Sequence, residues 1–132
     1  MYLLYAETDV GGIKMKRLLI LLLLTTWLAI PVRAEKWALL VGINNYPNDI
    51  SSLKYCVADV VAFRDTLVQT AAYKPQNIHL MTDQMSGQDL PQFINVLLRL
   101  ENLARQLQPQ DTLIFYFSGH GISTPDQSYL LA

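Results

Sequence analysis

One short segment carries the residues best suited to chemistry: Ser118, Gly119, His120 and Gly121 directly follow an apolar run. The ordinary pKa of imidazole lies near neutrality, so a histidine can accept and donate protons at physiological pH. The two glycines give the backbone around His120 unusual freedom and leave space for a ligand. A glycine-rich turn that happens to contain a histidine is the structural alternative, because such turns commonly follow strands.

A second candidate position is Cys56, the single cysteine, which lies near the start of an expected helix together with Asp59. A helix N-terminus lowers the pKa of a thiol, so Cys56 and His120 are one possible catalytic dyad. The structural alternatives are a small buried hydrophobic residue for Cys56 and a solvated or capping residue for Asp59. The other histidine, His79, alternates with apolar neighbours in an expected strand and is assigned no role.

The composition excludes several classes of protein. The 132 residues are 52% hydrophobic and 16% charged, which indicates one folded domain rather than a disordered chain. The formal net charge is -1, so no basic face is expected to bind nucleic acid. One cysteine and two histidines are too few for a disulfide or for a Cys/His zinc site, and no metal site is expected.

The elements that must position these residues alternate between strand and helix. Apolar runs bounded by turn residues predict strands over residues 36–43, 77–82 and 111–117. Apolar residues spaced by three and four predict a helix over residues 55–72. The same spacing predicts a second helix that starts near Asp89, which can cap it, and that ends before Pro109.

This order of elements favours an α/β fold with a parallel sheet. Strands joined by helices of this length call for right-handed crossovers, and ligands bind outside the carboxyl ends of such strands. The third strand is apolar almost throughout, which is typical of a parallel strand covered on both faces.

The residues before this pattern have the features of a targeting signal. Residues 15–34 have a basic start, an apolar run of about 14 residues and small residues at the end, which matches a signal peptide cleaved after Ala34. The run is too short to span a membrane comfortably, although an uncleaved anchor is the alternative. Residues 1–14 are interpreted as an upstream extension of the reading frame. We expect an exported protein, periplasmic or secreted, with no stable membrane anchor after cleavage.

Four segments of the chain together resemble the large-subunit region of caspase-like cysteine peptidases (peptidase C14), in particular bacterial metacaspase-type members. The segments are KWALLVGIN (36–44), LKYCVAD (53–59), NIHLMTD (77–83) and FYFSGHG (115–121). They occur in the right order and spacing, and the resemblance covers nearly all of residues 35–132. It implies a caspase–hemoglobinase fold, which is an α/β fold with a mostly parallel sheet and flanking helices.

The resemblance also implies roles for individual residues. His120 would be the catalytic proton acceptor and donor, and the amide of Gly121 would be one oxyanion donor. Cys56, Asp59 and Ser118 would line the pocket for the substrate residue before the scissile bond. Because a buried carboxylate is best matched by a cation, the implied cysteine endopeptidase would cleave peptides or proteins after Arg or Lys. The implied chemistry requires no cofactor.

The sequence departs from the family at the nucleophile. An Asp-Ala-Cys-like segment is expected on a further strand, and the acidic calcium-binding residues of some members would also lie beyond Ala132, so calcium is possible in a full-length parent. We therefore expect residues 35–132 to be the N-terminal part of a catalytic domain, truncated after its third main strand and inactive alone. Alternatives are a catalytically dead caspase-like binding module and an unrelated periplasmic binding protein, although the latter would need a glycine-rich phosphate loop that is absent.

Overall fold

The structure is a computed structural model that describes residues 33–47 and 50–132. Its elements follow in the order β1 (Lys36–Gly42), α2 (Cys56–Thr70), β2 (Ile78–Thr82), α3 (Phe93–Gln106), β3 (Thr112–Ser118), β4 (Gly121–Ser123) and β5 (Ser128–Leu130). Short 3-10 turns, Pro75–Asn77 and Gly87–Asp89, lie in the segments that lead to β2 and α3. The predicted extension and all but the last two residues of the predicted signal peptide lie outside the described residues.

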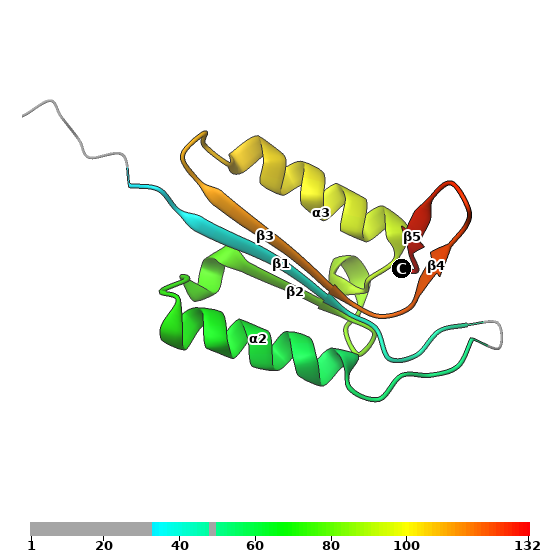
Figure 1. Cartoon of the computed structure of the whole chain (residues 1–132). Coiled ribbons are helices and arrows are strands. Elements are labelled where there is room, and N and C mark those ends of the chain that lie inside the picture. The colour runs from blue at the N-terminus through cyan, green and yellow to red at the C-terminus, as the bar shows by residue number, and fades with distance from the viewer. Residues whose placement is uncertain (1–32, 48–49) are drawn as a thin grey trace, which may run out of the picture. The chain divides into compact units, whose positions relative to one another are not determined.

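The main sheet has three parallel strands in the order β2-β1-β3. Leu40 in the central strand lies opposite Leu80 of β2 and Tyr116 of β3. Helix α2 covers one face of the sheet and α3 covers the other (Figure 1). The predicted α/β fold, with helices flanking a parallel sheet, is therefore confirmed and is consistent with a caspase-like fold.

The core forms on both faces of β1. Successive side chains of a strand point to opposite faces of the sheet. Leu40 accordingly packs in one cluster with Val60 of α2, whereas its neighbours Leu39 and Val41 pack in a second cluster with Leu103 of α3. Because a helix covers each face, the β1 side chains that point to either face must be apolar, which explains the unbroken apolar run of this strand.

Gly42 sets how closely the start of α2 approaches the end of β1. A Cβ at this position would lie 2.7 Å from the Cys56 carbonyl oxygen and 2.7 Å from Cγ2 of Val60. Both distances are well below van der Waals contact, so a side chain here would push the helix away. The first turn of α2 is therefore held directly against the carboxyl end of the sheet.

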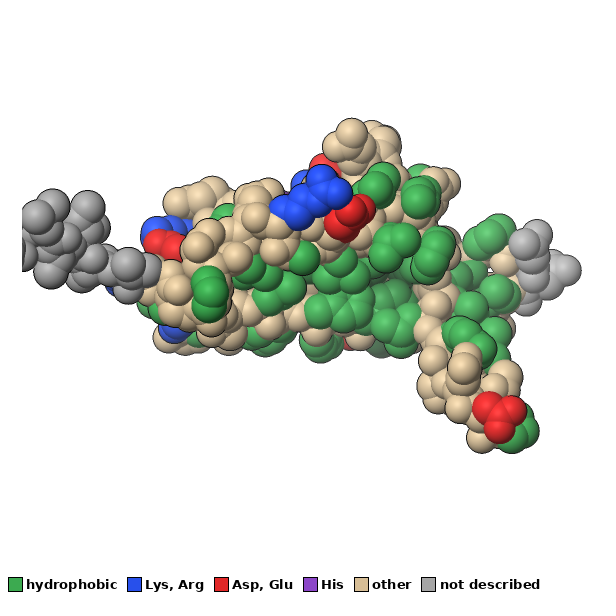
Figure 2. Space-filling model, turned by 90° about the horizontal axis from the view of Figure 1, so that it is seen from above, with side chains coloured by type: hydrophobic (Ala, Val, Ile, Leu, Met, Phe, Trp, Pro, Cys, Tyr) green, Lys and Arg blue, Asp and Glu red, His purple; other side chains and the backbone are tan. Residues whose placement is uncertain are grey.

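Strand β3 is less buried than its sequence suggested. It pairs with β1 within the described part of the chain, and Phe115 is 41% exposed, so the expected cover on both faces is not found. The reason is its place at the margin of the sheet, where neither helix covers it fully. Phe115, Phe117 and Leu97 of α3 line an apolar groove of about 330 Å³. Figure 2 shows hydrophobic side chains gathered along one side of the molecule.

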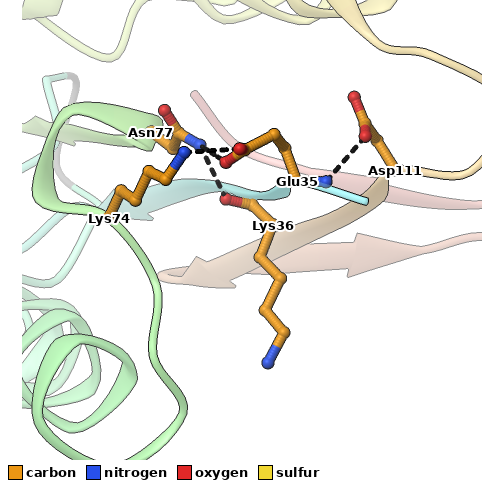
Figure 3. Close-up of polar contacts among 5 residues, drawn as sticks. All are labelled: Glu35, Lys36, Lys74, Asn77 and Asp111. Carbon is orange, nitrogen blue, oxygen red and sulfur yellow. Dashed lines mark hydrogen bonds and ion pairs between the residues drawn. The ribbon is translucent and has the colours of Figure 1, made fainter. Parts of the chain in front are cut away.

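Polar contacts centred on Glu35 join the amino ends of β1 and β3 (Figure 3). The Glu35 N–H donates to Oδ1 of Asp111 at 2.8 Å, and the Glu35 carboxylate pairs with Lys74 and accepts from Nδ2 of Asn77 at 3.1 Å. The other oxygen of Asp111 accepts from the N–H of Gln108 at 3.0 Å. The N–H groups of Gln108 and Glu35 hold the pKa of Asp111 below its usual value.

Helix α3 begins at Phe93, later than expected, and the prediction that Asp89 caps it is wrong. Asp89 belongs to the preceding 3-10 turn and pairs with Arg99 at 2.7 Å. Leu90, which follows Asp89, has an extended backbone. A residue before a proline disfavours the helical conformation, so Pro91 separates the turn from the helix.

Candidate active site

The segments that follow β1 and β3 meet at the carboxyl edge of the sheet. The two strands end in register, with Gly42 opposite Ser118, and the N–H of Ile43 donates to the Ser118 carbonyl at 3.0 Å. The segment after β1 carries Tyr46 and Ser51, while the segment after β3 carries His120. Parallel pairing thus brings together groups that are far apart in the sequence.

A backbone carbonyl orients the imidazole of His120. The Nε2 atom lies 2.7 Å from the carbonyl oxygen of Ser51. A carbonyl oxygen can only accept, so Nε2 carries a proton and Nδ1 of the neutral ring holds the free lone pair. His120 is therefore held in a tautomer whose Nδ1 can accept a proton.

Tyr46 makes two contacts with His120 that the sequence did not indicate. Its hydroxyl oxygen accepts the backbone N–H of His120 at 2.9 Å. The two rings also lie side by side, with centroids 5.0 Å apart and an interplanar angle of 60°. Burial raises the pKa of Tyr46 above its usual value, and the hydrogen bond from the His120 amide opposes this rise. The phenol is thus neutral at physiological pH.

Gly119 allows the Tyr46 hydroxyl to come this close. A Cβ at residue 119 would lie 2.3 Å from Oη of Tyr46 and 2.8 Å from the ring of Phe117. Neither Gly119 nor Gly121 has a left-handed φ, so the expectation of unusual backbone freedom around His120 is not met. What Gly119 supplies is space.

The N–H of Gly121 points away from the β4–β5 hairpin. The N–H of Leu131 donates to the His120 carbonyl at 3.0 Å, which puts these two residues at a hydrogen-bonded position of the ladder, with the His120 N–H bound by Tyr46 instead. Gly121 lies opposite Leu130 in the next pair of the antiparallel ladder. Because hydrogen-bonded and non-hydrogen-bonded pairs alternate, the Gly121 N–H is left available to a ligand oxygen.

Two of the three predicted pocket residues touch each other. Oγ of Ser118, at the end of β3, donates to Oδ2 of Asp59 in the first turn of α2 at 3.3 Å. Asp59 is exposed, however, so the expected buried carboxylate is not found. It lies on the solvent side of α2, where it can meet a cation that arrives from solution.

The third predicted pocket residue, Cys56, is buried. The residue is 8% exposed and outside any disulfide, and its carbonyl oxygen is packed against Gly42. Within the described residues the thiol forms no hydrogen bond to His120. The structure therefore places Cys56 in the position of a small core residue beside the site.

Two asparagines with no role predicted from the sequence, Asn44 and Asn45, hold the segment after β1. Oδ1 of Asn44 accepts the N–H of Val57 at 3.3 Å, which supplies a cap that the helix lacks from its own N-cap residue. Asn45 donates from its backbone N–H and its side chain to Oδ2 of Asp83, at 2.9 and 2.7 Å. The clustering of Asn44-Asn45-Tyr46 directly after a buried strand was the only sequence signal for these roles.

The arrangement offers a proton-transfer group, a backbone N–H donor and a carboxylate. In the parts of the chain that the structure describes, no group of three or more His, Cys, Asp or Glu side chains could hold a metal ion. No helix in the same parts is both long and apolar enough to cross a membrane.

Comparison with known proteins relates the chain to one family. The family model described as "Metacaspase, peptidase C14 domain" matches residues 36–130. Metacaspase-1 of Schizosaccharomyces pombe is 38% identical over 95 residues, which cover 71% of this chain and 22% of that protein. Metacaspase-1 of Yarrowia lipolytica is 40% identical over 88 residues, covering 66% of this chain and 19% of that protein. The chain thus spans about a fifth of the length of these relatives.

Proposed function

Because the chain belongs to the metacaspase family of C14 peptidases, we propose that it supplies the proton-transfer and substrate-binding groups of a cysteine endopeptidase. The observation that carries this proposal is the geometry of His120, whose Nε2 proton is held by the Ser51 carbonyl. Its substrates would be peptides or proteins, because both the imidazole and the Gly121 N–H suit attack on an amide carbonyl.

In the proposed reaction His120 moves one proton at a time. Nδ1 accepts the proton of a cysteine thiol, and the thiolate attacks the peptide carbonyl to form a C–S bond and an oxyanion. The imidazolium then gives its proton to the leaving amine as the C–N bond breaks, which leaves a thioester. Water, deprotonated by His120, hydrolyses the thioester and the thiol is restored. The Ser51 carbonyl stabilises the imidazolium that forms in both halves of this cycle.

The Gly121 N–H is proposed to stabilise the oxyanion. Its support is the ladder geometry, which turns this N–H away from β5 and leaves it accessible. A donor fixed before the reaction needs no reorganisation when charge develops on the oxygen, and loss of one such donor typically costs about 10² to 10³ in kcat.

Asp59 and Ser118 are proposed to select a basic residue before the scissile bond. The Ser118 hydroxyl, which donates to the carboxylate of Asp59, fixes one of its oxygens and leaves the other for an incoming cation. Arg or Lys would satisfy this oxygen, whereas a substrate Asp would be repelled by it. Because Asp59 is exposed, we expect a graded preference rather than an absolute one.

We propose that the nucleophile is a cysteine outside this sequence rather than Cys56. The Cys56 side chain is buried in the first turn of α2 and makes no hydrogen bond to His120 within the described residues. Use of Cys56 would require that turn to leave its close packing on Gly42.

Fluorogenic peptides that differ only in the residue before the cut test the proposal. A longer protein that contains residues 35–132 and a downstream Asp-Ala-Cys-like segment should cleave after Arg or Lys and lose activity on His120→Ala. The 132-residue chain alone should cleave none of these peptides. Thiol-dependent cleavage by this chain that is lost on Cys56→Ser would instead make Cys56 the nucleophile.

A further inference from the structure

We infer that Tyr46 is a positioning residue that fixes the direction of the His120 imidazole by holding the peptide plane that precedes it. This inference rests on the proposed function and deepens it. It starts from the hydrogen bond in which the Tyr46 hydroxyl accepts the backbone N–H of His120 at 2.9 Å.

The main chain of His120 is held on both sides. Tyr46 binds its N–H, which fixes the peptide plane shared with Gly119, while the N–H of Leu131 binds its carbonyl at 3.0 Å. In a planar trans peptide the C=O and the following N–H point in opposite directions. The contact with Leu131 therefore turns the Gly121 N–H outward, and the contact with Tyr46 stops the preceding peptide from rotating.

The two planes meet at the Cα of His120, so together they set the direction in which the imidazole leaves the backbone. Ser51 then fixes the far end of the ring through Nε2. The Tyr46 ring lies against the imidazole at 5.0 Å and restricts its rotation. Among the described residues, Tyr46 is the only one whose side chain hydrogen-bonds the main chain of His120.

Tyr46 is itself anchored well enough to serve this purpose. The preceding residue, Asn45, is tied by two hydrogen bonds to Asp83, directly after β2. Gly119 leaves room for the hydroxyl, which a Cβ would approach to 2.3 Å. Tyr46 thus anchors His120 to the segments that follow β1 and β2, in addition to the anchoring by the preceding strand β3.

Amide hydrogen exchange in the full 132-residue chain tests this directly, with Tyr46→Phe as the variant. The change removes one oxygen and leaves the His120 N–H without its acceptor, so exchange at His120 should accelerate about tenfold. The N–H of Ile43, which donates to Ser118 in the same edge of the sheet, should exchange at its original rate. The matched control is Tyr73→Phe, because Tyr73 is also buried but follows the C-terminal end of α2. This change should leave exchange at both His120 and Ile43 unaltered.

A second variant covers the case in which Tyr46→Phe fails to fold. Gly119→Ala keeps the phenol but displaces its hydroxyl, and it should accelerate exchange at His120 in the same selective way. Equal acceleration at His120 and Ile43 in both variants would reduce Tyr46 to a general structural role and overturn the inference. Unchanged exchange at His120 would overturn it as well.

A kinetic measurement then separates positioning from binding. In a cleavage-competent protein that contains this segment, Tyr46→Phe should lower kcat and leave KM unchanged, because the imidazole acts only on reacting atoms. A raised KM with unchanged kcat would contradict the inference. The exchange experiment requires no cleavage, so its failure is distinguishable from failure of the proposed peptidase activity.

Discussion

The imidazole Nε2 of His120 lies 2.7 Å from the carbonyl oxygen of Ser51, a residue 69 positions earlier in the sequence. The hydrogen bond joins the segment after β3 to the segment after β1 and leaves Nδ1 as the proton acceptor. A histidine that only filled a glycine-rich turn would need no such partner. The contact therefore favours the chemical interpretation of the Ser118–Gly121 segment over the structural one.

Gly42→Ala should destabilise the fold. Its Cβ would lie 2.7 Å from both the Cys56 carbonyl oxygen and the Val60 side chain, so α2 must move outward. Overpacking of this kind costs about 1 to 3 kcal/mol. For a domain of this size each kcal/mol lowers Tm by about 4–8 °C, which thermal unfolding followed by circular dichroism would measure. Gly121→Ala should lower Tm far less, because its Cβ would lie 3.3 Å from its nearest neighbour, the Tyr129 carbonyl oxygen.

Asp59→Asn should weaken the preference for basic substrates in a cleavage-competent protein. The change keeps the shape of the side chain and removes its charge, so kcat/KM for an Arg peptide should fall about fivefold, as expected for an exposed ion pair. Cleavage of a peptide with a neutral residue at that position should be little affected. Asp65→Asn, on the same helix and already paired with Arg64, is the control. A uniform fall for both peptides would remove Asp59 from the specificity pocket.

Stability should fall as the pH is lowered below about 6.5 because of His79. Burial, and then the charge of Arg99, lower the pKa of His79 in the folded chain, while Asp89 opposes this shift. Between the lowered pKa and the ordinary one, the unfolded state binds a proton that the folded state does not. Acidification in this range therefore favours unfolding.

The urea midpoint at pH 7.5 and at pH 5.5 measures this effect. The wild-type chain should lose more stability between these values than His79→Gln, which cannot take up the proton. The lowered pKa of Asp111 acts at lower pH, where its carboxylate begins to protonate, and so does not enter this comparison. Equal losses in the two proteins would contradict the prediction.

We also propose that the chain is exported and cut after Ala34. The cut would convert the backbone nitrogen of Glu35, which lies 2.8 Å from Oδ1 of Asp111, into an ammonium group beside a carboxylate. N-terminal sequencing of the product from a host with intact secretion should begin at Glu35. A soluble cytoplasmic product that retains Met15 would argue against export.

The sequence predicted the main elements because their signals are strong and local. The apolar run of β1 and the helical spacing of α2 gave elements within two residues of their observed ends. The β4–β5 hairpin was not predicted, since strands of three residues each, Gly121–Ser123 and Ser128–Leu130, carry too few residues to show alternation. The start of α3 differs from the prediction because Asp89 closes a 3-10 turn, and Leu90 before Pro91 keeps an extended backbone that delays the helix to Phe93.

The site was only partly accessible from the sequence. His120 stands out because it lies between two glycines shortly after an apolar strand. Its two partners do not, because the Ser51 contact uses a backbone carbonyl that every residue has, and the Tyr46 contact depends on how the segment after β1 meets the segment after β3. Exposure of Asp59 likewise depends on how α2 packs on Gly42, which the helical pattern does not determine.

The most direct test of the proposed function is the effect of His120→Ala on turnover. The measurement is steady-state cleavage of a peptide with Arg before the scissile bond, by a longer protein that contains residues 35–132 and a downstream cysteine. Loss of the proton acceptor and donor should reduce kcat by about 10² to 10⁴, with the thermal transition unchanged. A folded His120→Ala protein that retains wild-type kcat would contradict the assignment of His120 as the proton-transfer group.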